Sequence, residues 1–154
     1  MLEKGYPKKS FAVKSYYCRL GSSPNRSFLW KSIWKVKVPP RVAFFSWTSV
    51  LGKILTIDAL RKRGLIIADW CCMCKHNGES VDHLLLHCRL ALEMWSMVFA
   101  LFGVQWVMPH TVLDLFTGWY GFPGQNRCAV VWRIVPHCVI WCLWLEQKDR
   151  KSVV

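Results

Sequence analysis

Acidic residues are scarce in this sequence, which has nine Asp and Glu among 154 residues against 21 Lys and Arg. None of the acids stands next to another. A polymerase requires paired aspartates that bind metal ions, and a ribonuclease H requires a cluster of carboxylates. The sequence supplies neither set, and it has no Gly-x-Ser-x-Gly elbow and no phosphate-binding loop. We therefore predict that the chain is not an enzyme.

We expect no secretory leader, and the sequence has no long uninterrupted apolar run. The N-terminal segment MLEKGYPKKS is polar and basic, so we expect a nuclear or cytoplasmic protein with reduced thiols. The most apolar stretch, residues 128–145, contains Arg133, Pro136 and His137, and a charged side chain inside a bilayer costs about 3 kcal/mol. We expect no membrane span. The hydrophobic residues, 53% of the chain, are then available for the core of one domain.

Positive charge, by contrast, is abundant in one part of the chain. Residues 1–63 hold 14 Lys and Arg and two acids, whereas residues 64–154 hold seven of each kind. Such a block attracts a polyanion by neutralising phosphates and releasing counterions, so nucleic acid is the partner that we predict. A solvated basic face that keeps the protein soluble is the alternative. The candidate phosphate contacts are the basic residues between positions 31 and 63, namely Lys31, Lys35, Lys37, Arg41, Lys53, Arg61, Lys62 and Arg63.

The spacing of apolar residues predicts one mostly α domain over residues 27–150, after a basic and partly disordered arm at residues 1–26. Pro39-Pro40 separates the first two helices, and Pro136 is expected to interrupt or kink the last. An exposed Trp30 or Trp34 would be able to stack on a base, although core packing is the alternative for both. The predicted helices are a short one around residues 30–34, followed by 41–51, 57–63, 82–102, 111–116 and 126–148.

A small irregular zinc knuckle is predicted between these helices, in residues 65–81. A short apolar run precedes the first cysteines of this segment, and the Asn77-Gly78 pair is a strong signal for a tight turn. We therefore predict a short β-hairpin inserted between helices.

Metal-type ligands gather in and just after this segment. Four of them follow the spacing Cys71-x2-Cys74-x8-His83-x4-Cys88. Zinc takes thiolate and imidazole ligands in a tetrahedral shell, and four protein ligands leave no position for an activated water. The spacing therefore predicts a structural zinc site.

Two ligand assignments remain open on spacing alone. Cys72 can replace Cys71, although a C-x-C pair spans a tetrahedral edge less comfortably than a C-x2-C turn. His87 can replace Cys88, because His83 and His87 lie one helical turn apart on the same face. His83 and Cys88 lie about 140° apart around an ideal helix, so their joint use requires a distorted turn.

Besides the possible metal ligands, several blocks of the sequence form a combined pattern. They are WKSIW at 30–34, PPRVAFFSW at 39–47, ILTIDAL at 54–60, Arg63-Gly64, CCMC at 71–74 and ESVDHLLLHC at 79–88, with Trp95 downstream. Together these blocks closely resemble the zinc-binding domain that follows the reverse transcriptase in plant LINE-type (non-LTR) retrotransposon polyproteins. The resemblance covers about residues 26–150. Near the C-terminus, the sequence departs from the family's usual Trp-x-x-Trp-x-Glu-Arg-Asn ending at Gln147 and Lys148.

This resemblance implies that zinc is the cofactor and that the ligands are Cys71, Cys74, His83 and Cys88. It also implies a non-catalytic module that binds template RNA or target DNA beside a reverse transcriptase, whose domains are then a second partner. Two other functions are weighed against it. One is a protein-interaction or scaffolding module, and the other is a domesticated fragment of a retrotransposon polyprotein without a present function. Only phosphate binding predicts an affinity that falls steeply with salt.

Overall fold

The structure is a computed structural model that describes residue 30 and residues 33–120 and 129–152. The predicted basic arm at residues 1–26 and the candidate contact Lys31 lie outside the described residues.

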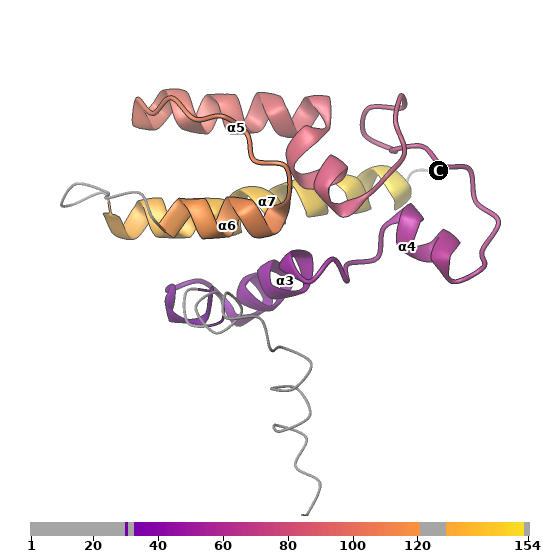
Figure 1. Cartoon of the computed structure of the whole chain (residues 1–154), viewed down its shortest axis with the longest axis horizontal. Helices are drawn as coiled ribbons and strands as arrows, with labels where there is room; N and C mark the ends of the chain where they lie inside the picture. The colour runs from indigo at the N-terminus through magenta and orange to yellow at the C-terminus, as the bar shows by residue number, and fades with distance from the viewer. Residues whose placement is uncertain (1–29, 31–32, 121–128, 153–154) are drawn as a thin grey trace, which may run out of the picture.

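The described part of the chain is mostly helical, as the sequence predicts. Figure 1 shows α5 (Arg89–Phe102) along one side of the pair α6 (Val112–Tyr120) and α7 (Ala129–Ser152), with α3 (Pro40–Val50) along the other side. The short helix α4 (Ile57–Lys62) and the cysteine loop lie at one end of these layers, where α7 also ends. This end of the molecule carries the candidate metal site.

Helix α3 begins at Pro40, because the proline ring fixes the φ that the first helical turn requires. It packs on α7 through Phe45, whose ring centroid lies 5.4 Å from that of Trp141 and 5.2 Å from that of Trp144. The apolar sequence of this helix predicts burial on all sides. That prediction is wrong on one face, where Phe44 is 59% exposed.

The sequence predicts a helix at residues 57–63, and α4 forms there with local signals at both ends. Thr56 accepts a hydrogen bond from the backbone N–H of Ala59 and so caps the first turn. After the last turn, Gly64 adopts a φ of 87°, which a residue without a side chain reaches at little cost.

The segment between α4 and η1 (His83–His87) forms no strand, so the predicted β-hairpin is wrong. A backbone hydrogen bond from the N–H of Cys71 to the oxygen of Asn77, at 2.6 Å, joins the two arms of the loop, but no ladder of such bonds follows it. Leu65, Ile66 and Ile67 are exposed, and no described strand pairs with them. The left-handed residue of the turn is Lys75, with a φ of 57°, rather than Asn77 or Gly78.

The predicted helix at residues 82–102 is divided in two. Its first part is the π-helical turn η1, and its second part is α5. Between them, Cys88 adopts extended torsions, with φ of −61° and ψ of 142°. Both parts are helical as predicted, but the uninterrupted helix is not formed.

Aromatic side chains fill the core between α5, α6 and α7. Trp95, Trp119 and Trp132 are buried, and the rings of Trp119 and Trp132 stack with centroids 4.2 Å apart. Helix α6 begins as predicted after Thr111, whose hydroxyl accepts a hydrogen bond from the N–H of Asp114, and it extends beyond residue 116. Three of the ten tryptophans are therefore buried in the core.

A buried histidine joins α7 to α3. His137 has no exposed surface, and its Nδ1 lies 2.7 Å from the hydroxyl oxygen of Ser46. Because that hydroxyl donates to the backbone oxygen of Val42, it accepts from the histidine N–H. Burial lowers the pKa of His137 to about 4, so the ring is neutral at physiological pH and serves the packing of the two helices.

Helix α7 runs unbroken through Pro136, so the predicted interruption is wrong. A proline has no N–H, and it therefore leaves the carbonyl of the residue four positions earlier without its helical hydrogen bond. That residue is Trp132, and its oxygen accepts a hydrogen bond from the indole Nε1 of Trp119 at 2.8 Å. A side chain of α6 thus supplies the donor that Pro136 lacks.

We expect a Trp119→Phe substitution to destabilise the domain by about 1–3 kcal/mol beyond the loss of ring contacts. The reason is that phenylalanine has no N–H to donate to the backbone oxygen of Trp132. Adding Pro136→Ala restores a backbone N–H at position 136, so the double variant is expected to recover about 1 kcal/mol. A double-mutant cycle measured by urea unfolding checks this coupling. Strictly additive effects of the two substitutions would contradict the compensation.

Helix α7 is also long and apolar enough to cross a membrane, judged by length and composition alone. One third of its most apolar window is buried, and the helix packs against α3, α5, α6 and η1. This packing is typical of a core helix. The absence of a membrane span stays a prediction.

Candidate metal centre

Four side chains from two segments meet beside the first turn of α5. The Sγ atoms of Cys71, Cys74 and Cys88 and a ring nitrogen of His83 all lie within 4.8 Å of one another. Cys71 and Cys88 are completely buried, whereas Cys74 and His83 are partly exposed. The structure therefore brings together the four residues that the sequence predicts as ligands.

The separations between these atoms fit a tetrahedral zinc site. Zinc lies about 2.3 Å from thiolate sulfur and about 2.0–2.1 Å from imidazole nitrogen, which puts neighbouring ligand atoms about 3.5–3.8 Å apart. The Sγ atoms of Cys71 and Cys88 are 4.0 Å apart, and Cys74 Sγ lies 3.3 Å from His83 Nε2. Three thiols and one imidazole in this arrangement suit one zinc ion in a closed, structural shell.

The backbone favours Cys88 over His87 as the fourth ligand. Residues His83–His87 form one π-helical turn, closed by a hydrogen bond of 2.6 Å from the N–H of Cys88 to the oxygen of His83. A π turn joins residue i to residue i+5, and here it brings His83 and Cys88 onto the same side. His87 is exposed, and its Nε2 lies 3.0 Å from the backbone oxygen of His110. The distorted turn that the sequence requires is therefore present.

Two side chains hold this turn in place. At its start, the hydroxyl of Ser80 accepts a hydrogen bond from the N–H of His83. At its end, the indole Nε1 of the buried Trp95 donates to the backbone oxygen of Leu85 at 2.9 Å. The irregular backbone that presents the ligands is thus hydrogen-bonded to side chains in place of regular helix partners.

The cysteine turn separates Cys71 from its neighbour Cys72. The backbone oxygen of Cys71 accepts from the N–H of Lys75 at 2.8 Å, which closes the turn over the site. Cys72 lies outside the four-residue cluster and instead lines a pocket together with Trp70 and Lys75. The structure therefore favours Cys71 over Cys72.

Comparison with known proteins also indicates a zinc site. Residues 11–95, more than half of the chain, match the family described as "zinc-binding in reverse transcriptase". The chain belongs to this family. No solved structure matches it. Zinc is the cofactor of this zinc-binding domain, and the cluster of three cysteines and one histidine is its site.

The zinc-binding domain is also similar to a longer plant protein. A relative from Arabidopsis thaliana, named "Putative ribonuclease H protein", is 33% identical over 139 residues. The match covers 87% of this chain and 22% of the relative. The domain therefore spans about a fifth of the length of that relative.

The thiols of the metal-free domain differ in acidity. Burial tends to raise the pKa of Cys74, but hydrogen bonds with the backbone N–H groups of His76 and Asn77 and with the side chains of His83 and Cys71 together outweigh it and lower the pKa to about 6. Burial raises the pKa of Cys71 to about 12 and also raises that of Cys88. Cys74 is therefore the thiol most readily available as a thiolate at neutral pH, and zinc binding requires proton release from the other two.

A buried carboxylate supports the zinc-binding loop from behind. Glu79 has no exposed surface, and its Oε1 accepts hydrogen bonds from the Ile57 N–H at 3.1 Å, Gln147 Nε2 at 2.7 Å and Lys151 Nζ at 2.8 Å. Its backbone oxygen also accepts from the N–H of Asp58. Glu79 thus joins the loop to the start of α4 and to the end of α7.

The sequence does not predict a structural role for Glu79. Its signals are an isolated acid between the second and third ligands and a place at the start of the family block at 79–88. Gln147, one of the two departures from the family's usual ending, proves to be 1% exposed and bonded to this carboxylate. The departure from the family's ending at Gln147 therefore falls on a buried residue that helps to hold the zinc-binding loop against α7.

The candidate phosphate contacts that the structure describes are all exposed. Two of them are already paired with carboxylates, Arg61 with Asp69 and Lys62 with Asp58. Among the described residues, no carboxylate lies within 4.0 Å of the remaining five, which are Lys35, Lys37, Arg41, Lys53 and Arg63.

Proposed function

We propose that this zinc-binding domain is a non-catalytic module that binds nucleic acid, either template RNA or target DNA, beside the reverse transcriptase of a non-LTR retrotransposon. The distribution of charge carries the proposal, since the whole excess of 12 positive charges belongs to residues 1–63. Membership of the family described as "zinc-binding in reverse transcriptase" supports it, because nucleic acid is the substrate of reverse transcriptases.

Exposed aromatic rings lie among these charges. Trp30 and Trp34 are 49% and 38% exposed, and their ring centroids are 5.2 Å apart. Trp30 also contacts Trp47 edge to face, so these rings are partly used in packing and partly exposed. Aromatic rings beside lysines and arginines are typical of surfaces that bind single strands.

The proposed role of the zinc site is structural: it holds the basic residues of α4 in position. Zinc, when bound, supplies a closed link between the cysteine loop and the π turn. The loop then fixes the position of α4 through Glu79, and α4 carries three of the candidate contacts, Arg61, Lys62 and Arg63, at its end. Metal binding and nucleic-acid binding are thus expected to be coupled through the fold.

We expect the triple variant Lys35→Gln, Lys37→Gln and Arg41→Gln to weaken RNA and DNA binding about equally across sequences. The slope of log affinity against log salt should flatten by about two to three units, because each lost duplex phosphate contact removes about 0.9. Filter binding between 50 and 200 mM salt measures both quantities.

A matched control removes the same charge elsewhere. The variant Arg89→Gln, Arg133→Gln and Lys148→Gln changes three exposed residues of α5 and α7, and its salt slope should stay close to that of the parent. Equal flattening in both triple variants would show a general effect of net charge and would contradict a localised surface.

Replacing Arg61, Lys62 and Arg63 by Gln gives a second test within the proposed surface. Arg61 and Lys62 are already paired with carboxylates, so they release fewer counterions on binding than unpaired side chains do. We therefore expect a change of about one unit in the slope.

A protein-interaction module is the second candidate function. The observation that favours it is the exposed apolar run of Leu65, Ile66 and Ile67, in which Ile66 is fully accessible. Exposed apolar groups of this kind mark contact sites for other proteins. Nucleic-acid binding without a salt slope, or no binding at all, would favour this function over the proposed one.

A further inference from the structure

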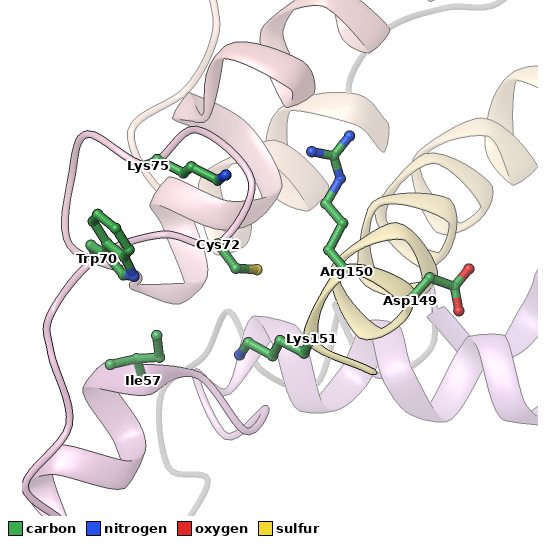
Figure 2. Close-up of a pocket in the computed structure, with 7 residues that line it drawn as sticks. All are labelled: Ile57, Trp70, Cys72, Lys75, Asp149, Arg150 and Lys151. Atoms are coloured by element: carbon green, nitrogen blue, oxygen red, sulfur yellow. The ribbon is translucent and has the colours of Figure 1, made fainter. Parts of the chain in front are cut away.

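A pocket of about 700 Å³ lies between the zinc-binding loop and the C-terminal end of α7 (Figure 2). Trp70, Cys72 and Lys75 of the loop form one wall, and Arg150 and Lys151 of α7 form the opposite wall. Its volume lies within the range of about 300–1,000 Å³ that is common for small-ligand sites. None of these five residues belongs to the four-residue metal cluster.

The basic side chains of the pocket come from both walls. Figure 2 shows Lys75 and Arg150 extending from opposite sides of the opening, while the carboxylate of Asp149 points away from the loop. Arg150 is paired with Glu146, and Lys151 is paired with the buried Glu79. Lys75 has no carboxylate within 4.0 Å among the residues that the structure describes, so its charge is the most available to an anion.

The aromatic side chain of the pocket is accessible. Trp70 is 55% exposed, and no other described aromatic ring stacks on it. It directly precedes the buried Cys71, so the zinc-binding loop fixes its backbone. An indole held at the rim of a basic pocket offers a flat face to a second planar group.

We propose that this pocket binds one unpaired nucleotide, with the base stacked on Trp70 and a phosphate held between Lys75 and Arg150. The proposal rests on the proposed nucleic-acid binding and assigns it a site for single strands. A paired base has both faces covered by its neighbours in the duplex, so stacking on Trp70 requires an unpaired nucleotide. A flanking phosphate accounts for cations on both walls of one opening.

The test compares a labelled 12-nucleotide oligouridylate, an oligothymidylate of the same length and a 12-base-pair duplex by fluorescence anisotropy with the full chain. We expect Trp70→Ala to lower single-strand affinity about tenfold and duplex affinity less than twofold. Trp70→Phe should retain most of the single-strand affinity. The strand that shows the larger loss identifies whether RNA or DNA is the ligand.

Charge variants provide the second arm of the test. Lys75→Gln is expected to reduce the salt slope for single strands by about 0.7, the value for one phosphate contact on a single strand. Lys148→Gln, which removes one exposed charge from α7 outside the pocket, is the matched control and should leave the slope unchanged. Zinc content is measured for every variant. If Trp70→Ala loses zinc, the comparison depends on Trp70→Phe and Lys75→Gln, which change the loop less.

Equal losses on single strands and duplex in Trp70→Ala with full zinc content would overturn the pocket assignment, as would an unchanged salt slope in Lys75→Gln. These results leave the proposed function standing if the triple variant of Lys35, Lys37 and Arg41 still flattens the slope. Failure of that triple variant alone would contradict the basic surface while the pocket assignment stands.

Discussion

Replacement of Cys88 by Ser is expected to lower zinc affinity more than about 100-fold and to leave the domain largely unfolded at zinc concentrations that saturate the parent protein. Loss of a group that merely orients a ligand already costs 10- to 100-fold, so loss of a buried ligand costs more. Binding of a structural zinc is also folding free energy, on the order of 10 kcal/mol in small zinc domains. Competition with a chromophoric chelator measures the affinity, and circular dichroism measures the fold.

His87→Ala is the matched control, because it removes a candidate ligand from the adjacent position. The side chain of His87 is exposed and lies against the backbone of His110 rather than in the cluster. We expect zinc affinity within about threefold of the parent, a small change compared with the loss of a ligand. The reverse order of the two variants would mean that the C-x8-H-x3-H pairing holds the metal.

Glu79→Ala is expected to destabilise the zinc-loaded domain by about 3 kcal/mol. The substitution removes the acceptor of three hydrogen bonds and leaves Gln147 and the backbone N–H of Ile57 buried without it. Lys151 is partly exposed and regains water, which holds the cost near the lower end of the range for buried pairs. Urea unfolding at saturating zinc measures the loss.

One further variant separates the charge of Glu79 from its hydrogen bonds, and a second serves as a control. Glu79→Gln keeps an oxygen for the N–H of Ile57, so we expect a cost of about 1 kcal/mol. Glu93→Ala removes an acid from an exposed ion pair with Arg89 on α5 and should change stability by less than about 0.5 kcal/mol. If Glu79→Ala has as small an effect as Glu93→Ala, the carboxylate does not join the loop to α7.

Local signals in the sequence predict the elements that depend on local interactions. Thr56 caps α4 because a side-chain acceptor at that position satisfies a free N–H of the first turn, whatever the rest of the fold is. Pro40 begins α3 for a similar local reason. The four zinc ligands also follow from spacing together with the resemblance, since the chemistry of the metal limits the residue types.

The remaining features depend on partners that are distant in the chain. At Pro136 of α7, the oxygen of Trp132 has a donor from Trp119, and the π turn before Cys88 has a donor from Trp95 to the oxygen of Leu85. The spacing of apolar residues predicts that a segment is helical, but it does not reveal a single π turn within the helix. An uninterrupted α-helix and a helix with one π turn have similar apolar patterns. The β-hairpin prediction fails for a related reason: the apolar run at residues 65–67 has no partner strand in the described chain.

The ligand set is the central claim, and X-ray absorption at the zinc edge tests it most directly. The measurement uses the parent protein purified without chelator, after elemental analysis of its metal content. We predict one zinc per chain, with a first shell of three sulfur atoms at about 2.3 Å and one nitrogen atom at about 2.0–2.1 Å. A shell of two sulfur and two nitrogen atoms would contradict the assignment of Cys88 over His87, and the absence of stoichiometric zinc would contradict the site itself.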